Sequence, residues 1–216
     1  MPLPRGLFSL SLLWALASFV AAVGAGAPIQ PTAGAYAPGV RAYLALLALG
    51  IVAAWPVARL TLDRRRWPAD RAVLDTCVVA VLLQGAFWPL HLVTPWSLGR
   101  DVAIDLLLSG WAVAAGAVVA LGRGTPRRGT PLALAAVAVA GAGPIVDILD
   151  GPPGLACALG PLAGLARLTT AWHGPDPVEW QVASWPWIVA ACLWSTVILL
   201  GRRGPHACPD ARVRLP

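Results

Sequence analysis

Six stretches of this chain are apolar and nearly free of charge, and each approaches the ~20 residues that an α-helix needs to cross a bilayer. They are Leu7 to Ala27, Ala42 to Ala58, Ala72 to Pro95, Val102 to Gly122, Pro131 to Ile148 and Ser184 to Gly201. Charged residues make up 12% of the chain and apolar residues 58%, against about 25% and 45–50% in an ordinary soluble domain. The sequence therefore predicts an all-α integral membrane protein with six transmembrane helices.

The positions of the arginines predict the orientation of these helices. Arg5 precedes the first span, and arginine-rich connections follow the second, fourth and sixth spans, whereas the connections between them hold few arginines. Because cytoplasmic loops carry the excess of basic residues, both termini are expected in the cytoplasm, with the chain in the cell (plasma) membrane. No basic stripe is interleaved with aromatic residues, so the net charge of +6 does not indicate nucleic-acid binding.

The N-terminal span permits a second interpretation. Arg5, the apolar run and Ala25-Gly26-Ala27 resemble a secretory signal with a small-residue cleavage site. Pro28 follows that site directly, and its missing N–H and fixed φ should hinder cleavage. We expect the segment to remain as a span.

The chain is expected to form one polytopic membrane domain over residues 1–203, with a short cytoplasmic tail over 204–216. It contains no GxxxxGK[ST] loop, so ATP-driven work would need a separate subunit. The four cysteines, at positions 77, 157, 192 and 208, offer no disulfide framework. No HExxH or CxxC motif predicts a metal site, no cofactor motif is present, and no catalytic residue is assigned.

The outer segment 150–185, between the fifth and sixth spans, is too long for a simple turn. GPPG ends the fifth helix, and Leu162 to Trp172 then forms an apolar stretch too short to span the membrane. Pro161 favours a helix start, so this stretch is predicted to be a short helix that lies on the membrane surface or enters it part-way. It would serve as a lid or re-entrant element, or only as an amphipathic connector.

Polar residues within the spans gather toward the outer side of the predicted bundle. Gln84 and His91 lie seven residues apart on one face of the third span, with Gln84 near the middle and His91 toward the outside, and Asp105 lies near the outer end of the fourth. Asp147 and Asp150 end the fifth span, where the helix dipole disfavours a negative charge. Since ionisable residues inside a membrane are usually functional, these five residues form a candidate proton or cation site.

A structural role is the alternative for the aspartates. Asp150 would then be solvated, and Asp147 would pair with Arg100 or Arg167. We predict instead that Asp147 faces Asp105 across closely packed fourth and fifth spans. That packing would rest on small residues, which are Ser109, Gly110 and Gly116 in one span and Gly141 and Gly143 in the other.

Architecture is the only guide to function at this stage. Six spans, both ends inside and a broken helical element before the last span are similar to the plan of the membrane subunits of ABC-2 type exporters. This plan favours a membrane subunit of a transport or export system that is completed by other membrane or ATPase subunits. A non-catalytic scaffold or assembly factor is the second hypothesis, and an intramembrane lipid-modifying enzyme is the third.

Overall fold

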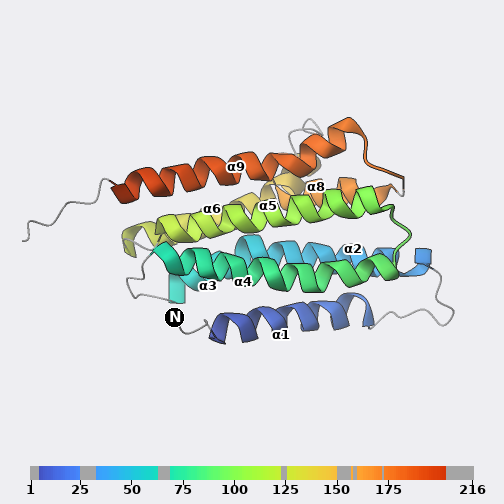
Figure 1. Ribbon diagram of the computed structural model, residues 1–216, viewed down its shortest axis with the longest axis horizontal. Helices are drawn as coiled ribbons and strands as arrows, with labels where there is room; N and C mark the ends of the chain where they lie inside the picture. Colours follow the sequence, from blue (N-terminus) through green and yellow to red (C-terminus); the bar gives the residue numbers. More distant parts are fainter. Residues whose placement is uncertain are drawn as a thin grey trace, which may run out of the picture.

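The computed structural model describes residues 5–24, 33–62, 69–122, 126–149, 157, 160–171 and 173–202. All regular secondary structure within these ranges is helical (Figure 1). In chain order the elements are α1 (Arg5–Ala22), α2 (Ala33–Leu49), the π-helical turn η2 (Gly50–Ala54), α3 (Trp55–Leu62), α4 (Ala69–Phe87), the 3₁₀-helix η3 (Trp88–Leu92), α5 (Leu98–Gly122), α6 (Pro126–Ile148), α8 (Pro161–Thr170) and α9 (Pro177–Arg202). The expected all-α class is confirmed.

Five helices are long and apolar enough to cross a membrane. They cover Gly34–Thr61, Asp70–Leu92, Leu98–Gly122, Gly129–Val146 and Pro177–Leu200. The apolar part of α1, Gly6–Ala22, is shorter. At 1.5 Å per residue it extends about 25 Å, against a hydrocarbon core of about 30 Å. Five candidate spans are therefore shown by their length and composition, and the sixth span remains a prediction.

The first of these candidate spans, Gly34–Thr61, corresponds to the second predicted span and begins about two turns before the predicted boundary at Ala42. It passes through the π-helical turn η2 immediately before Pro56, with the N–H of Trp55 bonded to the carbonyl of Gly50 five residues earlier. Proline has no N–H, and its ring clashes with the carbonyl four residues back, so a locally widened helix accommodates it. Gly50 also leaves room for the indole of Trp14, whose Nε1 donates to the carbonyl of Leu46 at 3.1 Å.

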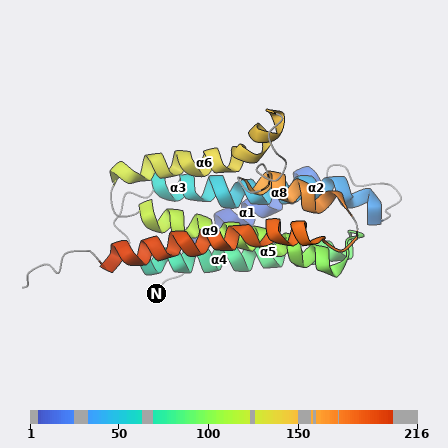
Figure 2. The same ribbon diagram turned by 90° about the horizontal axis from the view of Figure 1, so that it is seen from above.

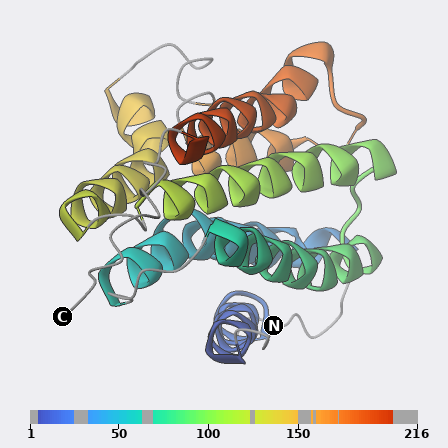
Figure 3. The same cartoon turned by 60° about the vertical axis from the view of Figure 1, so that its left-hand side comes forward.

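Helix α5 forms the centre of the bundle, with 67% of its apolar window buried against 17–39% for the other candidate spans (Figure 3). Its closest neighbour is α9, which runs parallel to it. Trp187 Nε1 donates to the Leu106 carbonyl at 2.9 Å, and Trp194 Nε1 donates to the Val113 carbonyl at 3.0 Å. The two tryptophans are seven residues apart on α9, and the two carbonyls that they contact are seven residues apart on α5. The two helices therefore keep the same register along their contact.

The small residues of the fourth span were predicted to pack against those of the fifth, and this pairing is wrong. A Cβ at Gly110 would lie 2.9 Å from the side chains of Pro186 and Trp187 on α9, and Gly116 abuts Thr76 on α4. On α6, Gly143 lies against Gly160 before α8. The glycines of α5 thus lie against α9 and α4 rather than against the glycines of α6.

The predicted short helix is present as α8, and it runs alongside the long helices rather than across their ends (Figures 1 and 2). Gly160 lies against Val139 and Gly143 of α6, and Gly164 lies against Leu107 of α5. One face is buried, comprising Pro161, Gly164, Leu165, Leu168 and Thr169. Helix α8 is therefore a half-length member of the bundle, antiparallel to α5.

Candidate functional site

Two facing rows of polar side chains lie between α4–η3 and the first half of α5. Gln84, Trp88 and His91 share a face of α4 and η3, where Pro89 follows the change from α-helix to 3₁₀-helix. Asp101, Asp105 and Ser109 follow one another at intervals of four residues on α5, and so they also share a face. The hydrogen bonds below show that the two rows meet.

Gln84 makes three of the hydrogen bonds in this cluster. Its Nε2 donates to Asp105 Oδ1 at 2.6 Å and to Ser109 Oγ at 3.2 Å, and its Oε1 accepts from Trp88 Nε1 at 2.6 Å. Ser109 Oγ in turn donates to Asp105 Oδ1 at 3.1 Å. The predicted association of Gln84 with Asp105 is present, whereas the roles of Trp88 and Ser109 in holding it were missed.

His91 lies one turn beyond Trp88 in η3 and contacts a different aspartate. Its Nδ1 is 2.5 Å from Asp101 Oδ2, and the side chain of His91 is 43% exposed while that of Asp101 is 2% exposed. Asp101 lies in the first turn of α5. The cap of α5 is Ser97, whose Oγ accepts from the backbone N–H of Arg100 at 3.3 Å. The carboxylate of Asp101 is thus left to bind His91.

The other two predicted members fall partly or wholly outside the described residues. The backbone of Asp147 belongs to α6, but its side chain and the whole of Asp150 lie outside what the structure describes. All hydrogen bonds of Asp105 within the described residues are made to α4 or to its own helix. The approach of Asp147 to Asp105 therefore stays a prediction.

A second polar centre, which sequence reasoning missed, joins α5, α8 and α9. The guanidinium of Arg100 is 1% exposed and is paired with Glu179, with Nη2 to Oε2 at 2.8 Å and Nη1 to Oε1 at 3.2 Å. Its remaining N–H groups donate to backbone carbonyls of Leu168 at 2.7 Å, His173 at 2.6 Å and Gly174 at 3.4 Å. Because all five N–H groups are used, Arg100 is not available as the partner of Asp147.

The sequence carried a signal for this centre in DPVE, Asp176 to Glu179. Asp176 Oδ1 accepts from the Glu179 N–H at 2.6 Å, and Glu179 Oε2 accepts from the Asp176 N–H at 3.0 Å. This reciprocal pair is a capping box, with Pro177 at the first helical position of α9. A glutamate fixed in this way is positioned to receive an arginine.

Asp105, which is half-buried, differs in its contacts from the buried aspartates Asp75 and Asp101. Asp75, at the opposite end of α4, accepts from Arg59 at 3.0 Å, and Asp101 contacts His91. Within the described part of the chain, Asp105 has no ion pair, and its hydrogen bonds both end at Oδ1. Its second oxygen is thus free to take a proton or a cation.

Other chemistry finds less support in the described residues. They contain no group of three or more His, Cys, Asp or Glu side chains placed to hold a metal ion. Ser195 and Thr196, in the last span, donate to the carbonyls of Ala191 and Cys192 within their own helix. These hydroxyl groups serve the helix, as expected for such residues in apolar surroundings.

The fold and the site together define an all-helical protein with candidate membrane spans and an unpaired carboxylate among them. Neither a family model, nor a curated protein, nor a solved structure matches the chain.

Proposed function

We propose that this chain is a multi-pass membrane subunit of a transport or export system, and that Asp105 binds the proton or cation that the system moves or uses. The supporting observation is the carboxylate of Asp105, which is half-buried within α5 and, among the residues that the structure describes, receives hydrogen bonds only from the neutral groups of Gln84 and Ser109. A carboxylate in hydrocarbon is costly when it is charged and unpaired. Taking up a proton or a cation removes that cost.

The surroundings of Asp105 suit exchange with the outside. His91 and Trp88 continue the cluster toward the end of α4, and both are more than a third exposed. Under the predicted topology, with both termini cytoplasmic in the plasma membrane, this end faces out. A proton or cation would then reach Asp105 past His91, while partner subunits supply energy and the remainder of the pathway.

A scaffold or assembly factor is the alternative function. In that case Asp105 would act only as a hydrogen-bond acceptor that holds α5 to α4 through Gln84. Asp105→Asn separates the two functions, since the amide oxygen still accepts from Gln84 and Ser109 but the side chain no longer carries a titrating charge.

The test uses the tagged protein purified with its natural partners and reconstituted into liposomes that contain a pH-sensitive dye. The proposal predicts that Asp105→Asn leaves expression and partner co-purification unchanged but lowers proton or cation-coupled flux at least tenfold. Asp70→Asn is the matched control, because Asp70 is an exposed aspartate in the first turn of α4. If the flux of the Asp105→Asn complex equals that of the wild type, or if the wild-type complex shows no flux, the transport function is wrong.

A further inference from the structure

The side-chain amide of Gln84 is held in one orientation. Trp88 Nε1 contacts one end of it at 2.6 Å, and the other end contacts Asp105 Oδ1, also at 2.6 Å. An indole N–H can only donate a hydrogen bond, so the end that faces Trp88 is the amide oxygen. The amide nitrogen of Gln84 is therefore directed at Asp105, and it brings hydrogen rather than an oxygen lone pair to the carboxylate.

Both hydrogen-bond partners of Asp105 within the described residues present hydrogen to it. Gln84 Nε2 and Ser109 Oγ donate to Oδ1 at 2.6 and 3.1 Å, and Ser109 Oγ also accepts from Gln84 Nε2 at 3.2 Å. These bonds use both lone pairs of Oδ1 and one of Ser109, so Oδ2 and a single lone pair of Ser109 are left. Mg²⁺ and Ca²⁺ take about six to eight oxygen ligands, and K⁺ is also held by several oxygens. Two oxygen atoms fall far short of either.

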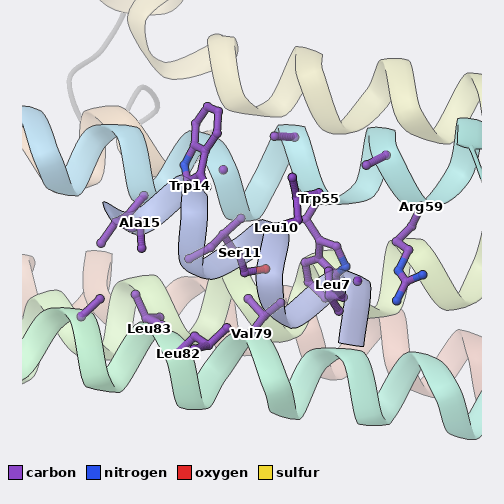
Figure 4. A pocket seen from close by; sticks show the side chains of 17 residues that line it. Leu7, Leu10, Ser11, Trp14, Ala15, Trp55, Arg59, Val79, Leu82 and Leu83 are labelled. Atoms are coloured by element: carbon purple, nitrogen blue, oxygen red, sulfur yellow. The ribbon is translucent and has the colours of Figure 1, made fainter. Parts of the chain in front are cut away.

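The opposite face of α4 does not supply the missing ligands. It borders a cavity of about 630 Å³ between α1 and α4, and the α4 part of the wall is apolar, consisting of Val79, Leu82, Leu83 and Ala86 (Figure 4). At about 100° per residue, Gln84 lies on the other side of the helix from this wall. Because apolar cavities stay dry, water in the cavity does not complete the coordination of a cation beside Gln84.

The other titratable side chains described on the helices around Asp105 do not add a second anionic ligand either. The carboxylates are paired, as Asp101 with His91, Glu179 with Arg100 and Asp75 with Arg59. Arg167 on α8 carries positive charge, and the side chain of Asp147 on α6 lies outside the described residues. The charge of Asp105 is thus the one that a bound ion would meet in the described part of this cluster.

We infer that Asp105, in the ion-binding role proposed above on which this inference rests, takes a proton and excludes metal cations, and that Trp88 sets this selectivity by holding the amide of Gln84. A proton needs only one oxygen, and it adds to Oδ2. Oδ1 keeps both of its hydrogen bonds whether the carboxyl group is charged or neutral, so the cluster does not rearrange. A metal cation would instead meet the positive ends of the N–H and O–H groups of Gln84 and Ser109.

The experiment is infrared difference spectroscopy of the full-length protein in lipid vesicles, which detects the carbonyl band of a protonated carboxyl group. Loss of the band in Asp105→Asn assigns it to Asp105. At the pH where the wild-type band has half its full height, sodium, potassium, magnesium or calcium chloride replaces N-methylglucamine chloride at constant ionic strength. The band should follow pH but stay unchanged with each metal cation, because a bound cation would displace the proton.

Trp88→Phe removes the N–H that holds the amide. The oxygen of Gln84 is then free to turn toward Asp105 and join it and Ser109 as a ligand, so sodium should weaken the band severalfold, increasingly with its concentration. Trp180→Phe is the matched control, since Trp180 is 38% exposed against 39% for Trp88, while Gln84 accepts its bond from Trp88. Gln84→Glu is a second variant, in which one carboxylate oxygen still accepts from Trp88 and the other faces Asp105, so calcium should weaken the band.

The inference is overturned if a metal cation weakens the wild-type band at fixed pH, a result that leaves a cation form of the proposed function standing. It is also overturned if Trp88→Phe and Trp180→Phe respond equally to sodium. Should Trp88→Phe fail to fold, Gln84→Glu decides, and an unchanged band in calcium overturns the inference. If no pH-dependent band belongs to Asp105, the proposed function fails and this inference fails with it.

Discussion

Replacing Arg100 with alanine should destabilise the bundle more than any other single loss of an arginine in the described residues. The change leaves the carboxylate of Glu179, which is 7% exposed, without its counter-charge. It also leaves the buried carbonyl of Leu168 without a donor. The three elements that meet at Arg100, which are α5, α8 and the start of α9, lose their common partner.

The magnitude follows from the kind of interaction that is broken. Removing one partner of a buried ion pair costs about 3–5 kcal/mol, because the remaining charge stays buried. For a chain of this length each kcal/mol lowers the melting temperature by about 2–4 °C, so a decrease of roughly 6–20 °C is expected. Thermal unfolding in detergent, followed by the loss of the monodisperse peak in size-exclusion chromatography, measures it.

A control variant and a double variant test this prediction further. Arg167→Ala is the control, since Arg167 lies on α8 without an ion pair among the described residues, and a change within about 0.5 kcal/mol is expected. Combining Arg100→Met with Glu179→Met should cost less than the sum of the single changes, because no charge is left buried. The reasoning is refuted if Arg100→Ala melts within 2 °C of the wild type, a limit of about 1 kcal/mol, or if the double variant is strictly additive.

Three other changes test the packing, a helix cap and the topology. Gly110→Ala should lower the stability by about 1–3 kcal/mol, because the added Cβ forces α9 away from α5. Gly85→Ala is the control and should be neutral or stabilising, since nothing lies within 4 Å of its added Cβ. Equal thermal stability of the two variants would contradict the close contact at Gly110. Asp176→Ala should cost about 1 kcal/mol through the lost cap of α9, and an unchanged melting temperature would count against the capping box. The third change replaces Arg65 with cysteine in a chain whose own cysteines, Cys77, Cys157, Cys192 and Cys208, have been replaced. The new thiol should react with an impermeant maleimide only after the cells are opened, and labelling of intact cells would show that the orientation is the opposite of the predicted one.

The class of fold was predictable from the sequence because apolar length and the absence of charge act locally. The apolar sequences that form α5 and α9 are longer than the apolar stretches of helices in soluble proteins, and each forms a long helix in the structure. The helix at Pro161 was also predictable, since a proline start and a short apolar stretch are local signals. The early start of α2 was missed because Arg41, which lies inside the helix, was taken as its boundary.

The partners of the buried polar groups were less predictable, because they depend on which helix faces which. Gln84 and Asp105 were both included in the predicted cluster, and they do meet, but depth along the spans placed Gln84 near the middle and Asp105 at the outer end. Depth alone also does not distinguish α4 from α6 as the neighbour of Asp105. The pairing of Arg100 with Glu179 spans 79 residues and requires α8 to enter the bundle. Only the capping box at Asp176 marked one half of that pair in the sequence.

The most direct test of the central claim is modification of Asp105 by dicyclohexylcarbodiimide, an apolar reagent that attacks protonated carboxyl groups in membranes. The protein in lipid vesicles is treated across a range of pH, with and without sodium or potassium ions, and the modified peptide is identified by mass spectrometry. If Asp105 binds a proton or cation, it is modified selectively, and raised pH or the bound cation protects it, while exposed Asp70 stays unmodified. If Asp105 remains unmodified at every pH, or reacts with no dependence on pH and cations, the proposed proton or cation site is wrong.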